Sequence, residues 1–190
     1  MVTATSPLIA QGVLDIGPPG ALTIPGGIHY FAYLKVGNQL INNGQRVYPL
    51  MSDPNRVVFH EVEVTLLGTN NQPLGISPNQ YRVFASGAAA STTSSDPNFG
   101  IAAADVIPST VGALIATAFA GQPNTTIIVQ ARVIGTTAGS AEVTSGPMFF
   151  PIRLCAGCLF QCARDAMGVP ITTPIPSCSP GQDAVTRYGC

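Results

Sequence analysis

The segment from Arg56 to Leu67, Arg-Val-Val-Phe-His-Glu-Val-Glu-Val-Thr-Leu-Leu, decides the fold. Apolar and polar side chains alternate along it. The apolar positions expected to face a core are Val58, Val62, Val64 and Leu66, and the polar positions expected to face water are Glu61, Glu63 and Thr65. A period of two residues with one polar side is typical of a strand in an antiparallel sheet that buries one face.

The same alternation recurs on both sides of this segment. It predicts strands at Leu8 to Ile16, Ile28 to Val36, Tyr81 to Ala85 and Ile127 to Val133, and a last strand from Ala141 to Leu154 that is interrupted at Gly146-Pro147. Clusters of Gly, Pro and Asn separate these runs, and no long helical pattern lies between them. We therefore expect an all-β fold, an antiparallel β-sandwich of the Ig-like or jelly-roll-like kind.

The tetrapeptide Ser-Asp-Pro-Asn occurs twice, at Ser52 to Asn55 and at Ser95 to Asn98. Its carboxylate and carbonyl oxygens are of the type that binds calcium, but an ordinary calcium site needs more clustered acidic residues. Pro presets the backbone angle at the second position of a type I turn. We therefore interpret both copies as turns.

Two further segments are less regular. Ala85 to Ser95 consists of small residues with Ser and Thr, which predicts a mobile loop. Phe99 to Gly121 is rich in Ala and other apolar residues. We expect either one or two short helices there or an irregular crossing between the sheets.

Charged residues make up 9% of the 190-residue chain, whereas ordinary soluble domains have roughly 25%. The formal net charge is −1, and 46% of the residues are hydrophobic. Because a low net charge promotes association, we expect a homo-oligomer or a polymer. The eight basic residues are scattered and Trp is absent, so the sequence lacks the phosphate-binding pattern of a nucleic-acid partner.

No segment is expected to span a membrane. The cleanest apolar run, Val111 to Ala120, is far shorter than the ~20 residues that a spanning helix needs. Met1 to Thr5 lack the basic start and the apolar core of a signal peptide. Clustered cysteines indicate an oxidising compartment, so we expect an exported protein, extracellular or at the cell surface, whose signal has been removed.

All five cysteines lie in the last part of the chain, which we divide into a β-sandwich domain (1–154) and a Cys-rich tail packed on the same domain (155–190). They are Cys155, Cys158, Cys162, Cys178 and Cys190. We expect structural disulfides that staple a tail of short helix and loop, each worth roughly 2–4 kcal/mol in the chain-entropy model. Two bridges leave one cysteine over and the pairing stays open. Cys190, the last residue, is the freest to reach another chain.

Two other interpretations of the cysteines stay open. Cys155-Ala156-Gly157-Cys158 follows an expected strand and precedes an expected short helix from Cys158 to Met167. A helix N-terminus lowers the pKa of a thiol, as redox catalysis needs, but that motif normally belongs to a βαβ fold. A zinc site of four cysteines normally uses two Cys-x-x-Cys pairs, and this sequence has one.

The sequence shows no credible active site. His29 and His60 lie on expected strands among apolar residues, and no nucleophile motif accompanies them. Glu61 and Glu63 share a strand face, which is more typical of a solvated face than of paired catalytic carboxylates. We therefore predict that the chain is not an enzyme and has no catalytic residue, cofactor or metal site.

The run from Phe150 to Leu159, followed by Cys162, Cys178, Pro180-Gly181-Gln182-Asp183 and Cys190, resembles the tail of predicted bacterial cell-surface lipoproteins. The likeness extends to Tyr33 through Leu40 and to the strand around Val62 to Leu66, so it covers most of the chain. The resemblance implies export, a β-rich extracellular domain and attachment at the outer surface. It supplies no known catalytic residues.

These observations favour a non-catalytic structural protein, a subunit of a self-associating extracellular assembly such as a filament, a sheath or a surface layer. The N-terminal run with apolar Val2, Ala4, Leu8 and Ala10 could pair within its own domain or add as an edge strand to a neighbouring subunit.

Two alternatives belong to other classes. The first is a monomeric, surface-anchored binding module that holds its ligand with sandwich loops such as Ala85 to Ser95. The second is a thiol oxidoreductase that uses Cys155 and Cys158.

Overall fold

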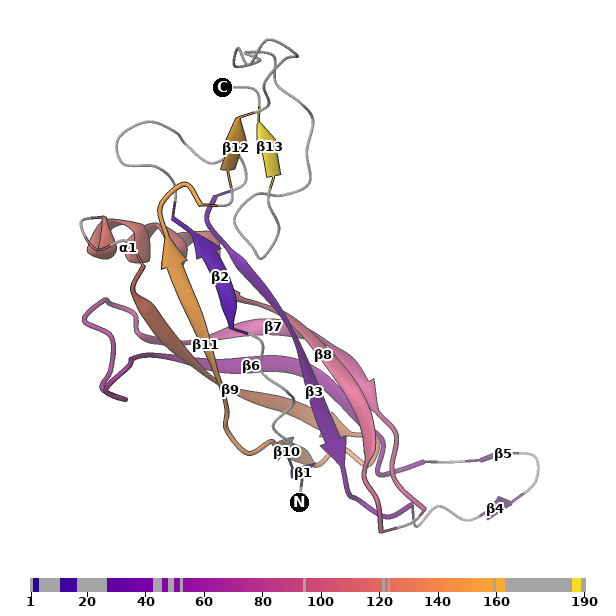
Figure 1. The fold of residues 1–190 in the computed structure, drawn as a ribbon. Coiled ribbons are helices and arrows are strands. Elements are labelled where there is room, and N and C mark those ends of the chain that lie inside the picture. The colour runs from indigo at the N-terminus through magenta and orange to yellow at the C-terminus, as the bar shows by residue number, and fades with distance from the viewer. Residues whose placement is uncertain are drawn as a thin grey trace.

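The structure of the chain is a computed structural model, and the part of the chain that it describes is mostly β with one short helix (Figure 1). It describes residues 2–3, 11–16, 27–42, 46–47, 50–51, 53–93, 95–120, 122, 124–158, 160–162 and 186–188. The expected β-rich fold is confirmed. Among these residues, no helix is both long enough and apolar enough to cross a membrane.

The elements follow one another from β1 to β13, with the helix between β8 and β9. They are β1 (Val2–Thr3), β2 (Gly12–Asp15), β3 (Tyr30–Asn38), β4 (Arg46–Val47), β5 (Leu50–Met51), β6 (Val57–Gly68), β7 (Gln80–Ala89), β8 (Asn98–Ile107), α1 (Ser109–Phe119), β9 (Thr126–Thr137), β10 (Glu142–Thr144), β11 (Met148–Cys155), β12 (Phe160–Cys162) and β13 (Thr186–Tyr188).

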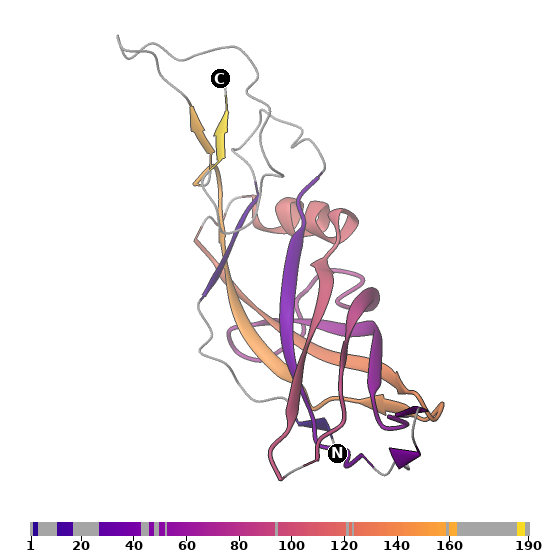
Figure 2. The same cartoon turned by 90° about the vertical axis from the view of Figure 1, so that its right-hand side faces the viewer.

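One mixed sheet of nine strands forms the body, in the order β1-β3-β8-β7-β6-β9-β11-β2, with β10 paired to β9. The β11–β2 pairing is parallel and the others are antiparallel. The sheet curls until it is nearly closed into a barrel (Figure 1; Figure 2). This differs from the two packed sheets expected from the sequence, because Ala85 and Ser86 of β7 pair with Ala104 and Ala103 of β8 and join the two halves.

An aromatic side chain connects the two ends of the sheet. Tyr30 of β3 reaches across to β2, where a Cβ on Gly12 would overlap the Tyr30 hydroxyl group. The Tyr30 ring also lies 6.5 Å, centroid to centroid, from the ring of Phe150 on β11. Glycine at position 12 is therefore what allows β3 to close against β2 and β11.

The longest strands, β6 and β9, form the middle of the sheet and pair from Val57↔Thr137 to Gly68↔Ile127. Their inward side chains are fully buried, as the alternation predicted. Exposure is 0% for Val62, Val64, Leu66, Ile127, Val129 and Ala131. Burial of such side chains stabilises the fold by about 1.5–3 kcal/mol for each large residue.

One expected core residue, Val58, is 49% exposed. The register of β6 against both of its neighbours shifts between Phe59 and Glu61. An extra residue in one strand changes whether odd-numbered or even-numbered residues face inward. Odd-numbered Val57 and Phe59 are therefore buried before the shift, and even-numbered Val62 is buried after it. The prediction for Val58 was wrong because a bulge cannot be recognised from alternation alone.

The segment from Phe99 to Gly121 contains a strand and a helix. Its first part is β8, in which Ala102, Ala104 and Val106 are buried. Its second part is α1, at the end of the sheet where β3 begins (Figure 1). A Cβ on Gly112 would overlap the carbonyl oxygen of Ile28, so glycine permits this close approach. The expected short helix is confirmed for α1, and the expected irregular crossing is a regular strand.

The mobile loop expected at Ala85 to Ser95 is wrong over its first half, because β7 continues to Ala89. Small residues here serve a close approach between strands. A Cβ on Gly87 would overlap the carbonyl oxygen of Ile101, and one on Gly100 would overlap that of Ala88. The run of small residues was therefore interpreted as a loop, whereas in the structure it permits two strands to pack closely.

Beyond β11, β12 pairs with β13 in parallel, and both lie past the ends of β11 and β2 in the two views (Figure 1; Figure 2). The helix expected from Cys158 to Met167 is wrong at Phe160–Cys162, where the chain is a strand. Residues 163–185 lie outside the described residues. The division into 1–154 and 155–190 stays a prediction.

Candidate functional site

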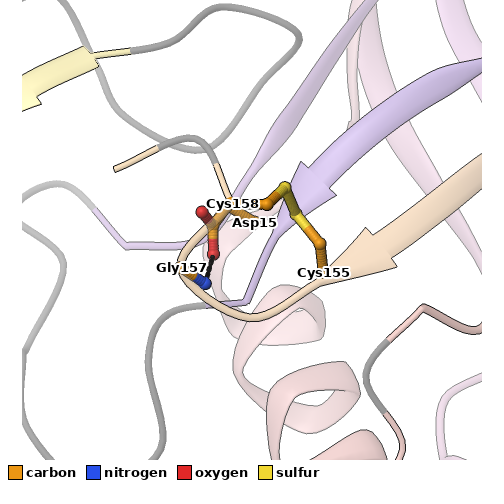
Figure 3. The surroundings of a disulfide bond; sticks show 4 residues. All are labelled: Asp15, Cys155, Gly157 and Cys158. Carbon is orange, nitrogen blue, oxygen red and sulfur yellow. Dashed lines mark hydrogen bonds between the residues drawn. A yellow bond between two sulfur atoms is a disulfide. The ribbon is translucent and has the colours of Figure 1, made fainter. Parts of the chain in front are cut away.

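β11 ends at Cys155, and a turn over 156–158 follows it (Figure 3). A disulfide joins Cys155 to Cys158 across this turn. Gly157 has a φ of 74°, a conformation that glycine adopts without strain. Cys155 is 2% exposed, whereas Cys158 is exposed. The disulfide therefore joins a buried cysteine to an exposed one.

Asp15, the last residue of β2, lies beside this turn (Figure 3). It is in register with Cys155, and its side chain is fully buried. Its Oδ1 accepts a hydrogen bond of 2.7 Å from the N–H of Gly157. One carboxylate oxygen of Asp15 and the two sulfurs all lie within 4.8 Å of one another. A buried carboxylate thus adjoins the disulfide.

This disulfide closes a small loop, because the two cysteines are separated by 3 positions in the sequence. The chain-entropy model gives about 2 kcal/mol for such a loop, less than the expected closures of the tail. The bond uses both thiols, so neither Cys155 nor Cys158 links the tail to the body here. Zinc binds thiolates, and sulfurs joined in a disulfide are not thiolates.

The other sequence-predicted site residues fall mostly outside the described residues. The backbone of Cys162 lies in β12, and Cys178 and Cys190 are not described. With Cys155 and Cys158 paired, these three allow one further bridge with one cysteine over.

Of the predicted inter-subunit run, Val2 lies in β1 and pairs with Asn38 of the same chain. Ala4, Leu8 and Ala10 lie outside the described residues. The described part of the run therefore pairs within its own domain, which was one of the two expected outcomes.

The histidines and paired glutamates contact neighbouring strands. His60 Nε2 lies 3.2 Å from Thr136 Oγ1, and His29 Nδ1 lies 3.8 Å from Asp105 Oδ2. Burial raises the pKa of the Asp105 carboxyl more than His29 and the backbone of Tyr30 lower it. The His60 contact joins β6 to β9, and the His29 contact joins the residue just before β3 to β8.

Glu61 and Glu63 share one partner, Arg82 of β7. The guanidinium lies 3.2 Å from a Glu61 oxygen and 3.8 Å from a Glu63 oxygen. All three side chains are partly open to solvent, which agrees with the predicted solvated strand face. Screening by water makes such pairs worth little for stability.

The two Ser-Asp-Pro-Asn copies meet at Ser91 and Thr92. Asp53 Oδ2 accepts a hydrogen bond of 3.1 Å from the N–H of Ser91, and its own carbonyl accepts one from Arg56, which closes a turn. Thr92 Oγ1 donates to the carbonyl of Asp96 at 2.6 Å. Burial raises the pKa of the Asp53 carboxyl, but the bonds from Ser91 and the turn backbone lower it by more. The turn prediction is confirmed at Asp53.

A groove opens on the outside of the sheet where β7 and β8 separate. The two strands pair at Ala85 and Ser86, and towards Gln80 they diverge around a volume of about 550 Å³. The lining residues are Phe31, Arg82, Val83, Phe84, Ala85, Ser86, Ala103, Ala104, Asp105 and Pro108. Tyr81 Oη donates to the carbonyl of Val106 at 2.7 Å and bridges the separated strands.

Large apolar side chains gather on the outside of β3, β8 and β7. The register Tyr33↔Ala103 and Ser86↔Ala103 places alternate residues of the three strands on one side of the sheet. We call this set the apolar face, and its exposures are 91% for Phe84, 72% for Tyr33, 49% for Ile101, 44% for Phe99 and 41% for Phe31. Lys35 Nζ lies 4.1 Å from the centre of the Phe99 ring.

The outside of β6 and β9 around Glu63 is polar. The pairs Glu63↔Arg132 and Glu63↔Arg82 place these charges side by side on the same surface of the sheet. We call Glu61, Glu63, Arg82 and Arg132 the charged face. The same sheet therefore presents an apolar half and a charged half to solvent.

Sequence reasoning missed both Asp15 and the apolar face. Asp15 and Gly157 are 142 positions apart, and only the parallel β2–β11 pairing brings them together. The only trace of the apolar face in the sequence is the Ala-rich stretch after Phe99. Apolar residues stand at its outward positions as well as at its inward ones, so the two-residue period of a strand is hidden.

Comparison of the sequence with protein-family models and with curated proteins finds no match.

Proposed function

We propose that this chain is a non-catalytic, exported structural subunit that associates with further copies of itself into an extracellular assembly such as a filament, a sheath or a surface layer. The observation that carries the proposal is the apolar face. It makes the outside of β3 and β8 suited to contact with a second copy.

The composition of this face supports a protein contact. Phe84 and Tyr33 are 91% and 72% exposed, although large aromatic side chains are among the most costly to leave in water. Aromatic residues are enriched at the centres of protein interfaces, and contiguous exposed apolar patches mark interaction sites. A net charge of −1 leaves little electrostatic repulsion between copies.

The contact is assigned to the apolar face in preference to the N-terminal strand, because β1 pairs with β3 of its own chain. Glu61 and Glu63 already share Arg82, so new ion pairs with a partner would add less free energy of association at the charged face. Of these three surfaces of the described residues, the apolar face therefore has the most apolar side-chain area to remove from water on association.

The proposed location is extracellular or at the cell surface. The Cys155–Cys158 disulfide supports an oxidising compartment. Membership of the surface-protein family that the tail resembles, with attachment at the outer surface, belongs to the same proposal.

A concentration series tests the proposal. Static light scattering is expected to show a mass that rises with concentration, and negative-stain microscopy is expected to show ordered assemblies at the highest concentrations. A constant monomer mass with dispersed particles throughout the series would refute self-association.

The groove between β7 and β8 favours a second candidate function, a monomeric surface-anchored binding module. Its walls carry aromatic Phe31 and Phe84 with Arg82 and Asp105. An apolar pocket with a few charged groups is typical of a ligand site. A monodisperse monomer that binds an aromatic or amphipathic ligand, with loss of binding in Phe84→Asp, would favour this candidate over the assembly.

A further inference from the structure

The groove between β7 and β8 holds an acidic side chain between two aromatic ones. Phe31 of β3 pairs with Asp105 of β8, and the side chains of such a pair are neighbours on one side of the sheet. The β7–β8 register, continued by one residue past Ala85, places Phe84 opposite Asp105 on the other side. All three side chains line the groove. One carboxyl group therefore lies between two phenylalanines in a row across three strands.

The next row across β7 and β8 consists of small residues. Ser86 pairs with Ala103, and both line the groove. Their short side chains leave space beside the two aromatic rings. The volume of about 550 Å³ lies within the roughly 300–1,000 Å³ that is typical of sites for small molecules.

The Asp105 carboxyl is only partly compensated by its neighbours. His29 Nδ1 lies 3.8 Å from Oδ2, too far for a hydrogen bond, and the backbone of Tyr30 also interacts with the carboxyl. Oδ1 is covered from water, and no described residue donates a hydrogen bond to it. The side chain as a whole is 31% exposed, so a molecule in the groove can reach it. A cation bound beside this carboxylate would offset the cost of its desolvation.

The charges around the groove favour a cation over an anion. Arg82 lines the groove, but its guanidinium lies 3.2 Å from a Glu61 oxygen and 3.8 Å from a Glu63 oxygen. Arg132 is the cross-strand neighbour of Glu63. The three carboxylates, that of Asp105 included, outnumber the two guanidinium groups. This part of the surface is therefore negative and attracts positive ligands.

We propose that the groove binds a small organic ammonium ion, with the ammonium group beside Asp105 and its apolar stem between Phe31 and Phe84. A carboxylate accepts charge-assisted hydrogen bonds from an ammonium group, and the faces of aromatic rings attract cations. The inference rests on the second candidate function, the binding module, and names the class of its ligand. It does not depend on the association of copies.

Calorimetric titration of the full-length chain with three probes tests the charge preference. The probes carry the same phenyl ring and ethylene stem: 2-phenylethylammonium is a cation, 2-phenylethanol is neutral and 3-phenylpropanoate is an anion. The protein is kept dilute enough for light scattering to give a constant mass, because Phe31 and Phe84 also belong to the apolar face. We expect the cation to bind at least about tenfold more tightly than the alcohol, and the anion to bind most weakly.

Asp105→Asn removes the charge and keeps the shape of the side chain. In this variant the cation should lose about tenfold in affinity and bind no better than the alcohol. Glu142→Gln makes the same change of net charge at an exposed residue of β10 outside the groove, and it should keep the preference. A preference for the cation that survives in Asp105→Asn would overturn the assignment of the ammonium group to Asp105.

Phe84→Ala tests the aromatic wall at a side chain that is 91% exposed and makes no part of the core. The cation should bind about threefold more weakly to this variant, so the inference stays testable even if Asp105→Asn does not fold. An unchanged affinity would contradict the aromatic wall.

Two results with the wild type would overturn the inference. Equal binding of the cation and the alcohol would leave the groove as a site for apolar molecules, and the binding module would stand without its cation. Binding of none of the three probes would overturn the binding module as well. Self-association is measured separately by the light-scattering series, so its failure is distinguishable from both results.

Discussion

The apolar face and the charged face lie on the same side of one sheet, yet they present opposite chemistry to solvent. On β6, Glu63 lies beside Arg82 of β7 and Arg132 of β9. On β3 and β8, Tyr33 and Ile101 are 72% and 49% exposed in the corresponding outward positions. The backbone alternation is the same in both halves, and only the outward residues differ.

The inward residues do not show this difference. Val64 and Leu66 of β6 are fully buried, and so are Val36 of β3 and Ala104 of β8, each with at most 1% exposure. Both halves therefore contribute to one core. The inward residues therefore set the fold, while the outward residues decide which half of the sheet is suited to water and which half to contact with another molecule.

The largest effect is expected from breaking the shared inward side. Leu66→Ala removes a fully buried side chain and should lower the free energy of unfolding by about 2–5 kcal/mol. The adjacent outward Thr65→Ala should change it by less than about 0.5 kcal/mol. Urea unfolding followed by circular dichroism measures both variants, and equal losses would contradict the assignment of sides.

The next largest effect, on association, is expected from placing charged residues on the apolar face. Tyr33→Asp combined with Phe84→Asp should raise the concentration needed for association at least about tenfold, because interface aromatics contribute more than about 1 kcal/mol each. Sedimentation velocity measures the change. Phe149→Asp, at a phenylalanine of β11 that is 45% exposed outside the apolar face, is the matched control and should leave association unaltered. An equal effect of the control would reject the face.

The difference between the two halves also decided how far the sequence could predict the fold. β3, β6 and β9 alternate clearly, and their strands were predicted, with most of the inward residues of β6. β8 was not, because Phe99 and Ile101 are apolar on the outward side while Ala102 and Ala104 are apolar on the inward side. The outward apolar residues that suit this face to association are also the residues that hide the two-residue period of β8.

Other parts of the structure depend on long-range pairing that no local pattern carries. The approach of Asp15 to the disulfide turn needs the parallel β2–β11 pairing, and the closure of the sheet needs Tyr30 to meet Gly12. The bulge in β6 reversed the direction of Val58 for a similar reason, since it depends on the partner strands. Turn residues were more informative, and the turn at Asp53 was predicted correctly.

A smaller effect is expected from the reverse change. Arg132→Tyr places an aromatic residue on the charged face, where Glu63 then keeps Arg82 as its partner. Association should increase by about threefold, because a single added aromatic is less effective than a contiguous patch. Light scattering at fixed concentration measures this. No increase would show that the position of the apolar residues matters more than their number.

The smallest effect is expected from two aspartates whose contributions to the free energy of unfolding change with pH in opposite directions. The pKa of Asp53 is lowered in the folded state, so its ionised form stabilises the fold above the unfolded pKa, and that stability is lost as the pH falls through the folded value. The pKa of Asp105 on the groove is raised, so the folded state holds its proton more tightly and gains stability as the pH falls through the raised value.

Urea midpoints at neutral pH and at roughly pH 4 or below test this contrast. Relative to Asp53→Asn, the wild type should lose stability in acid. Relative to Asp105→Asn, it should gain stability in acid. The same sign for both variants would contradict the two environments assigned here.

Hydroxyl-radical footprinting tests the central claim most directly, because it reports which side chains lose contact with water on association. Oxidation of Tyr33 and Phe84 is expected to fall between dilute and concentrated protein, while oxidation of Phe149 stays the same. Protection of Phe149 with unchanged Tyr33 and Phe84, or no protection at any concentration, would contradict association through the apolar face.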